Sequence, residues 1–202
     1  MAHPQADAAY REYLVTTHGV VRASVPLMCA ALAEASARAG ADPVSAALRD
    51  YLPRHIREEG GHDRWILEDL QLIGVDARAV LQRVPSPQVA ALVGAQYYWI
   101  HHHHPIALVG YMAALEGLPP SKASIERLRR RSGLDPRAFR TILEHADIDQ
   151  AHGEEIFRLV DRLPLNATLS ALLGASALHT VAAMAEVIDE VVARCVMAAS
   201  HR

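Results

Sequence analysis

The chain has 202 residues, of which 51% are hydrophobic, and a formal net charge of −3. This length suits a single domain, residues 1–202, that buries about 70% of the surface its unfolded chain would expose. The slightly negative charge provides no broad basic field, so we expect no nucleic-acid partner.

Apolar residues recur at helical spacing along nearly the whole chain. The pattern predicts five long helices and two short ones over Ala6–Ala39, Pro43–Ile73, Ala77–Val84, Gln88–Leu115, Lys122–Arg131, Asp135–Arg162 and Asn166–Ala198. Pro105 is expected to kink the fourth of these helices, and Asp135 and Asn166 are expected to cap the last two. No segment alternates with period two between hairpin turns, so the fold class is predicted to be all-α, a multi-helical bundle.

Two cysteines, Cys29 and Cys195, fall in apolar helical stretches. They are predicted to be reduced core residues of a cytoplasmic protein. No run of about 20 uninterrupted apolar residues is present and the amino terminus lacks a basic-plus-apolar signal, so neither a membrane span nor export is expected.

The second predicted helix carries a group of possible metal ligands. His55, Glu58, Glu59 and His62 stand at positions i, i+3, i+4 and i+7, which share one helix face. Glu58 and His62, one turn apart, form the Glu/His pair found in helical bundles that bind two metals. Two glycines precede His62 and cost about 1 kcal/mol each relative to alanine, so a bulge or a closely packed neighbouring backbone is expected there. The alternative is a charged surface helix with two chance histidines.

Glu116 is the one acidic residue in the apolar run that follows Pro105. A carboxylate at a helix C-terminus is unfavourable with the helix dipole unless a cation faces it, so Glu116 is predicted to bind a metal. The alternative is that Glu116 is simply the first solvent-exposed residue at the end of the helix. The four histidines His101–His104 point in different directions, and helical phase puts His102 nearest to the Glu116 face.

A third group lies on the helix that runs from Leu143 to Val160. His145, Asp149 and His152 are spaced i, i+4 and i+7 and therefore project from one face. Two imidazoles and a carboxylate suit non-heme iron, with manganese and zinc as alternatives. A solvated polar stripe would give the same spacing.

Together, the HxxxDxxH motif of His145, Asp149 and His152, the Glu/His helix that reaches His62, and Glu116 in HPIALVGYMAALEG resemble the heme-oxygenase-like diiron oxidase family. The resemblance covers roughly residues 51–160. It implies a heme-oxygenase-like bundle of about seven helices and two Fe(II) ions, the second weakly held. It also implies a dioxygen-dependent oxidase or oxygenase that oxidises, N-oxygenates or cleaves a small amino-acid-like or fatty-acid-like metabolite.

Residue by residue, the resemblance implies metal ligands at His62, Glu116, His145, Asp149 and His152. The family's first carboxylate usually stands about two turns before the first histidine, where this chain has His55. Glu58 is the expected replacement, with Glu59 or His55 as alternatives. Each choice would alter the charge and affinity of one metal position.

Three other functions are compatible with the sequence. His18 lies in the first predicted helix, where true heme oxygenases carry their heme ligand, but a hydrogen-bonded core histidine is expected instead. The same fold hosts metal-free thiaminase-II-like and pyrroloquinoline quinone synthase-like enzymes. Thiaminase chemistry needs an activated cysteine, and neither cysteine has such a setting. A non-catalytic helical binding protein is the third possibility. We expect a homodimer, the commonest oligomeric state of soluble proteins.

Overall fold

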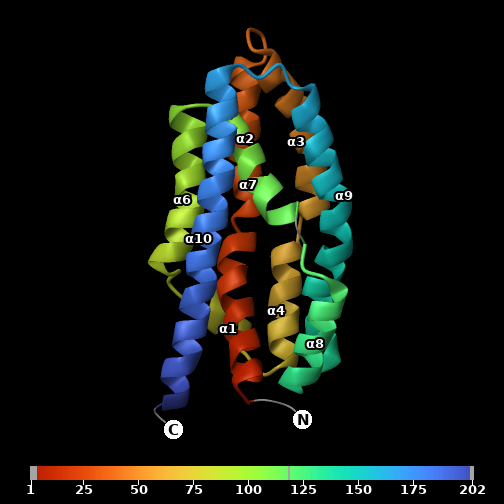
Figure 1. Cartoon of the computed structure of the whole chain (residues 1–202), viewed down its shortest axis with the longest axis vertical. Coiled ribbons are helices and arrows are strands. Elements are labelled where there is room, and N and C mark those ends of the chain that lie inside the picture. Colours follow the sequence, from red (N-terminus) through yellow and green to blue (C-terminus); the bar gives the residue numbers. More distant parts are fainter. Residues whose placement is uncertain (1–3, 118, 201–202) are drawn as a thin grey trace.

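The computed structural model describes residues 4–117 and 119–200. These residues form ten α-helices and one 3-10 helix, and they contain no strand. The elements in chain order are α1 (Pro4–Val21), α2 (Ser24–Arg38), α3 (Pro43–Glu59), α4 (His62–Leu72), α5 (Ala77–Gln82), α6 (Pro87–His102), α7 (Ile106–Glu116), α8 (Lys122–Ser132), η1 (Pro136–Phe139), α9 (Arg140–Arg162) and α10 (Ala167–Ser200). The long helices run roughly along the long axis of the molecule, with α7 in their midst (Figure 1). The all-α class is confirmed.

Two of the predicted long helices are divided at a proline. The first consists of α1 and α2, which are separated at Arg22 and Ala23. Pro26, in the first turn of α2, has no backbone N–H for the carbonyl of Arg22, and its ring would clash with that carbonyl in a continuous helix. The fourth consists of α6 and α7. Pro105 lacks a backbone N–H, and the imidazole Nδ1 of His104 accepts a hydrogen bond from the N–H of Ile106 at 3.0 Å. A kink at Pro105 was predicted, and the structure has a complete break there; the break near Pro26 was not predicted.

The second predicted helix is divided at a glycine pair into α3 and α4. Gly61 has a φ of 96°, in the left-handed region that favours glycine. Glu59 is the last residue of α3 and His62 is the first of α4. The break, and not the period of a straight helix, therefore sets how these two side chains lie relative to each other.

α7 is the most enclosed helix of the bundle. Its residues from Ile106 to Met112 are all buried, and the helix packs against α2, α3, α6, α9 and α10. A helix that is apolar on all sides is stable only when other elements surround it. This enclosure brings Glu116, the last residue of α7, into the interior of the bundle.

The prediction that both cysteines lie in the core is wrong. Cys29 is exposed and Cys195 is half-buried. α2 buries a face formed by Leu27, Met28 and Ala31, and Cys29 lies outside that face. The apolar composition of a stretch therefore does not predict which of its residues the neighbouring helices cover.

Two segments, Gln5–Arg38 and Ala167–Met197, are long and apolar enough to cross a membrane by length and composition alone. The first comprises the two bundle helices α1 and α2, and the second lies within α10. Core helices of soluble proteins pass the same test, so this finding alone is weak evidence for a membrane span.

Candidate metal centre

Side chains from α3, α4, α7 and α9 meet in one cluster inside the bundle. They form two groups, and within each group the candidate ligand atoms all lie within 4.8 Å of one another. The groups are His55, Glu59, Glu116 and His152, and Glu59, His62 and His145. Glu59 belongs to both groups. The structure thus brings together predicted ligands from three separate stretches of the sequence.

The first group is held in close contact around Glu116. The Nε2 atom of His55 lies 3.1 Å from Oε2 of Glu116, and Nδ1 of His152 lies 3.2 Å from the same oxygen. The Nδ1 atom of His152 is also 3.5 Å from Oε1 of Glu59. Ligands at about 2.0–2.2 Å from one ion lie roughly 3 to 4 Å apart, so this spacing suits a shared cation.

The second group shares Glu59 and adds two histidines. The Nδ1 atom of His62 lies 3.1 Å from Oε2 of Glu59, and the rings of His62 and His145 meet edge-on with centroids 4.8 Å apart. The Nδ1–H of His145 donates a hydrogen bond to the carbonyl of Thr141 at 2.9 Å. Burial lowers the pKa of His145 and favours the neutral ring, so its Nε2 lone pair is available as a ligand.

Four buried polar atoms of the cluster each lie 3.1 to 3.5 Å from another of the four but form no well-aligned hydrogen bond with any described residue. They are Nε2 of His55, Oε1 of Glu59, Oε2 of Glu116 and Nδ1 of His152. Leaving such an atom unpaired costs on the order of 1–3 kcal/mol. All four belong to the first group, and one cation would satisfy them together. The residues present therefore fit a metal ion, and the mixture of nitrogen and oxygen donors suits iron.

The structure places Glu59 inside the cluster and Glu58 at its edge. The side chain of Glu59 is 8% exposed, whereas that of Glu58 is 35% exposed. Glu58 pairs with Arg54 at 3.1 Å, and one of its oxygens lies 3.5 Å from Nε2 of His152. Sequence spacing favoured Glu58 because it assumed an unbroken helix to His62. His55, the other alternative, is fully buried in the first group.

Asp149 is buried on α9, but its carboxylate belongs to neither group. Burial raises the pKa of Asp149 to about 8, with further contributions from the negative charges of Glu116 and Glu59, partly offset by His152. A cation nearby would favour the charged carboxylate. Its role as a metal ligand stays a prediction.

Two further features position the cluster. The hydroxyl of Tyr51 lies 2.9 Å from Nδ1 of His55 and fixes that ring. Sequence reasoning missed Tyr51, although its i, i+4 spacing from His55 was the signal that could have found it. Gly153 allows α7 and α9 to approach, because a Cβ there would lie 3.0 Å from the backbone oxygen of Glu116.

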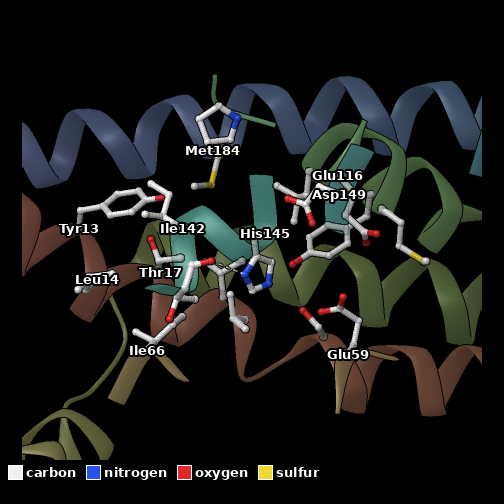
Figure 2. Close-up of a pocket in the computed structure, with 18 of the residues that line it drawn as sticks. Tyr13, Leu14, Thr17, Glu59, Ile66, Glu116, Ile142, His145, Asp149 and Met184 are labelled. Carbon is white, nitrogen blue, oxygen red and sulfur yellow. Dashed lines mark hydrogen bonds between the residues drawn. The ribbon is translucent and has the colours of Figure 1, made fainter. Parts of the chain in front are cut away.

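A cavity of about 180 Å³ adjoins the cluster. Glu59, Glu116 and Asp149 lie toward one end of it, Tyr13, Leu14 and Ile142 lie toward the other, and His145 lies between them (Figure 2). Most of the lining is apolar, and it includes no arginine or lysine among the described residues. The cavity thus offers an apolar chamber with the candidate ligands at one end.

The other histidines that the structure describes lie outside the cluster. His18 is buried as expected, but its Nε2 has no hydrogen-bond partner among the described residues and it lines a separate, smaller pocket. His102 is exposed, with its ring against Tyr98. The helical phase that put it nearest to Glu116 does not hold across the break between α6 and α7. His104 is buried and lies 2.7 Å from a carboxylate oxygen of Asp42.

Comparisons with known proteins identify the family and the fold. Residues 8–193 match a family model described as an iron-containing redox enzyme. A domain of unknown function with a heme oxygenase-like fold from Shewanella denitrificans has 20% sequence identity and a TM-score of 0.78, covering 92% of this chain and 78% of that one. A TenA homolog from Pseudomonas syringae pv. tomato has 17% identity and a TM-score of 0.68, covering 96% and 83%. The likeness to these two structures shows the fold alone. A search of curated proteins gave no match.

Proposed function

Because the chain belongs to the iron-containing redox enzyme family and has a heme oxygenase-like fold, we propose that it is a non-heme diiron oxidase or oxygenase that uses dioxygen. The observation that carries the proposal is the convergence of unpaired buried nitrogen and oxygen atoms on one point. Their close contacts with one another are not well-aligned hydrogen bonds, and a cation at their centre would satisfy all of them.

Two ions, rather than one, are proposed because Glu59 is shared. A carboxylate common to two groups of ligands is the arrangement by which helical bundles hold neighbouring metals. The first ion would be held by His55, Glu59, Glu116 and His152, and the second by Glu59, His62 and His145. Asp149, one turn from His145 and facing the cavity, remains the predicted additional carboxylate at the second ion. The second group has fewer donors, so we propose that its ion is the more weakly held.

When bound, two ferrous ions would supply electrons for the reduction of dioxygen. The chain's own contribution is to hold the donor atoms in the required protonation state. Tyr51 orients the ring of His55, and the carbonyl of Thr141 fixes the proton of His145 on Nδ1. The apolar walls of the cavity limit access of water to the reacting end.

The cavity also bears on the substrate. Because no arginine or lysine lines it among the described residues, a substrate carboxylate would have to be neutralised at the metal end. The apolar remainder suits a hydrocarbon portion. The apolar lining therefore favours a fatty-acid-like substrate over an amino-acid-like one, the two substrate classes that the sequence predicts.

Anaerobic reconstitution with Fe(II) tests the proposed function. We expect about two equivalents of iron per chain, and oxygen uptake that is lost when iron is removed with a chelator. The control is apoprotein carried through the same steps without iron. Failure to bind iron, or enzymatic activity that survives complete chelation, would exclude the diiron proposal and favour the metal-free relatives.

The thiaminase-II-like alternative requires a nucleophilic cysteine beside the substrate. Neither Cys29 nor Cys195 lines the cavity. Burial raises the pKa of the Cys195 thiol, the opposite of activation. These observations favour the iron-dependent proposal over this alternative. Cytoplasmic localisation stays a prediction.

A further inference from the structure

The outer sides of α6 and α10 carry large apolar side chains that no other described element covers. On α10, Leu178 is 74% exposed, Val181 59% and Val192 53%. On α6, Tyr98 is 57% exposed. The two helices lie side by side, since the hydroxyl of Ser176 donates a hydrogen bond to Gln96 at 3.0 Å. Their outer sides therefore form one continuous surface.

This surface has a regular spacing. Along α10, steps of four and three residues alternate between successive apolar or small residues. The sequence of positions is Gly174, Leu178, Val181, Ala185, Ile188 and Val192. The same alternation lets one helix pack its side chains between those of another. We call these residues, together with Gly94 and Tyr98, the α6–α10 face.

The α6–α10 face is nearly free of charge. No Asp, Glu, Lys or Arg occurs between Pro87 and Ile100 of α6 or between Ala167 and Ala185 of α10. Charged residues begin at Glu186 and lie toward the C-terminal end of α10. An uncharged centre with charges at its margin is the composition of an interface between proteins.

The size of the face reaches the lower limit for a specific interface. α6 has 16 residues and is about 24 Å long, and the α10 stripe from Gly174 to Val192 is about 27 Å long, so at a helix width of about 10 Å the face is on the order of 500 Å². The largest apolar patch on a typical monomer is about 300–600 Å² and is often functional. Two copies would together bury about 1,000 Å², the lower limit for a specific interface.

We propose that the α6–α10 face binds the same face of a second copy of this chain in a homodimer. A twofold axis requires one surface to complement itself. An uncharged face does so without repulsion, and its alternation of small residues such as Gly94, Gly174 and Ala185 with larger ones such as Leu178 provides both the knobs and the spaces between them.

A lipid surface fits the face less well, although Ala167–Met197 is apolar enough to span a membrane. Helices that lie on membranes carry Lys and Arg on the polar side and Trp, Phe or Leu on the apolar side. α10 has one Arg, no Lys, and neither Trp nor Phe. Asp189 is exposed at the charged margin of the face, beside Ile188, and an acidic group there disfavours insertion.

Light scattering coupled to size-exclusion chromatography tests the proposal. We expect the wild-type chain to have the mass of two copies and Leu178→Lys to have half that mass. Leu81→Lys is the matched control, because Leu81 is 50% exposed on α5, outside the face, and it should keep the twofold mass. Circular dichroism checks that both variants are folded.

Wild-type protein with the mass of one chain at every concentration tested would overturn the proposal without reliance on any variant. A twofold mass that persists in folded Leu178→Lys would place the interface elsewhere. Co-flotation of wild-type protein, but not of Leu178→Lys, with phosphatidylcholine and phosphatidylglycerol vesicles would instead assign the face to a membrane.

Discussion

Glu59 connects the two halves of the candidate metal centre. Its Oε2 lies 3.1 Å from Nδ1 of His62 in one group, while its Oε1 lies 3.5 Å from Nδ1 of His152 in the other. Neighbouring Glu58 instead pairs with Arg54 near the surface. Two adjacent residues of the same type therefore provide a matched comparison.

We predict that Glu59→Gln lowers the iron content at both positions, whereas Glu58→Gln keeps most of it. The amide has no charge to balance a cation, so binding at the shared ligand should weaken by at least about tenfold, or about 1.4 kcal/mol. Iron per chain after anaerobic loading and desalting is the measurement. Equal iron contents in the two variants would contradict the assignment of Glu59.

Tyr51 gives a second test at a residue that does not belong to either group of ligands. Loss of the partner that orients a metal-binding histidine typically lowers metal affinity about 10- to 100-fold. Tyr51→Phe removes only the hydroxyl next to Nδ1 of His55, so we predict a decrease of that size in affinity for the first ion, measured by titration with Co(II). Tyr97→Phe, a tyrosine whose ring lies against His101 away from the cluster, serves as the control and should leave affinity unchanged.

The break between α3 and α4 is the element that sets the geometry of the centre. It lies between Glu59 and His62, and it depends on the left-handed backbone of Gly61. A Cβ at Gly61 would meet no atom within 4 Å, so any effect of a side chain there is conformational and not steric crowding.

Substitution of Gly61 should therefore follow backbone preference. We predict that Gly61→Ala lowers the free energy of unfolding by about 1–2 kcal/mol, and that Gly61→Asn costs less, because asparagine tolerates the left-handed region better. For a chain of this length, a loss of 1 kcal/mol corresponds to a decrease in Tm of roughly 2–4 °C. Thermal unfolding measures both variants, and a larger loss in Gly61→Asn than in Gly61→Ala would contradict this account.

At the scale of the whole molecule, the bundle encloses three carboxylates in one region, Glu59, Glu116 and Asp149. Burial opposes ionisation of Glu116, but its contacts with His152 and His55 outweigh burial and hold its pKa below the usual value. Negative charge enclosed in an apolar surrounding destabilises a fold unless a cation compensates it. The stability of the protein should therefore depend on metal.

We predict that Fe(II) or Co(II) raises the Tm and that a chelator reverses the increase. Metal at 100 times its dissociation constant adds about 2.7 kcal/mol to the free energy of unfolding, because it binds the folded state alone. The measurement is thermal unfolding in an anaerobic buffer with increasing metal. Mg²⁺, which prefers oxygen ligands, is the control and should shift Tm little. A Tm that is independent of Fe(II) would contradict metal binding at the cluster.

Much of the fold and of the site was predictable from sequence because helical period governs residues within one helix. The all-α class follows from that period, and so does the shared face of His145 and His152 on the unbroken helix α9. Glu116 was identified because a carboxylate that ends a wholly apolar helix has little reason to be there without a partner.

Tertiary structure decided what depends on breaks and on neighbours. The left-handed Gly61 changes the helical phase, so Glu59 and not Glu58 joins the cluster. The breaks near Pro26 and at Pro105 divide helices whose apolar pattern is continuous. Cys29 is exposed because none of the helices in the described part of the chain covers its side of α2. A sequence specifies which residues share a face, but the packing of distant elements determines which faces are buried and which side chains meet.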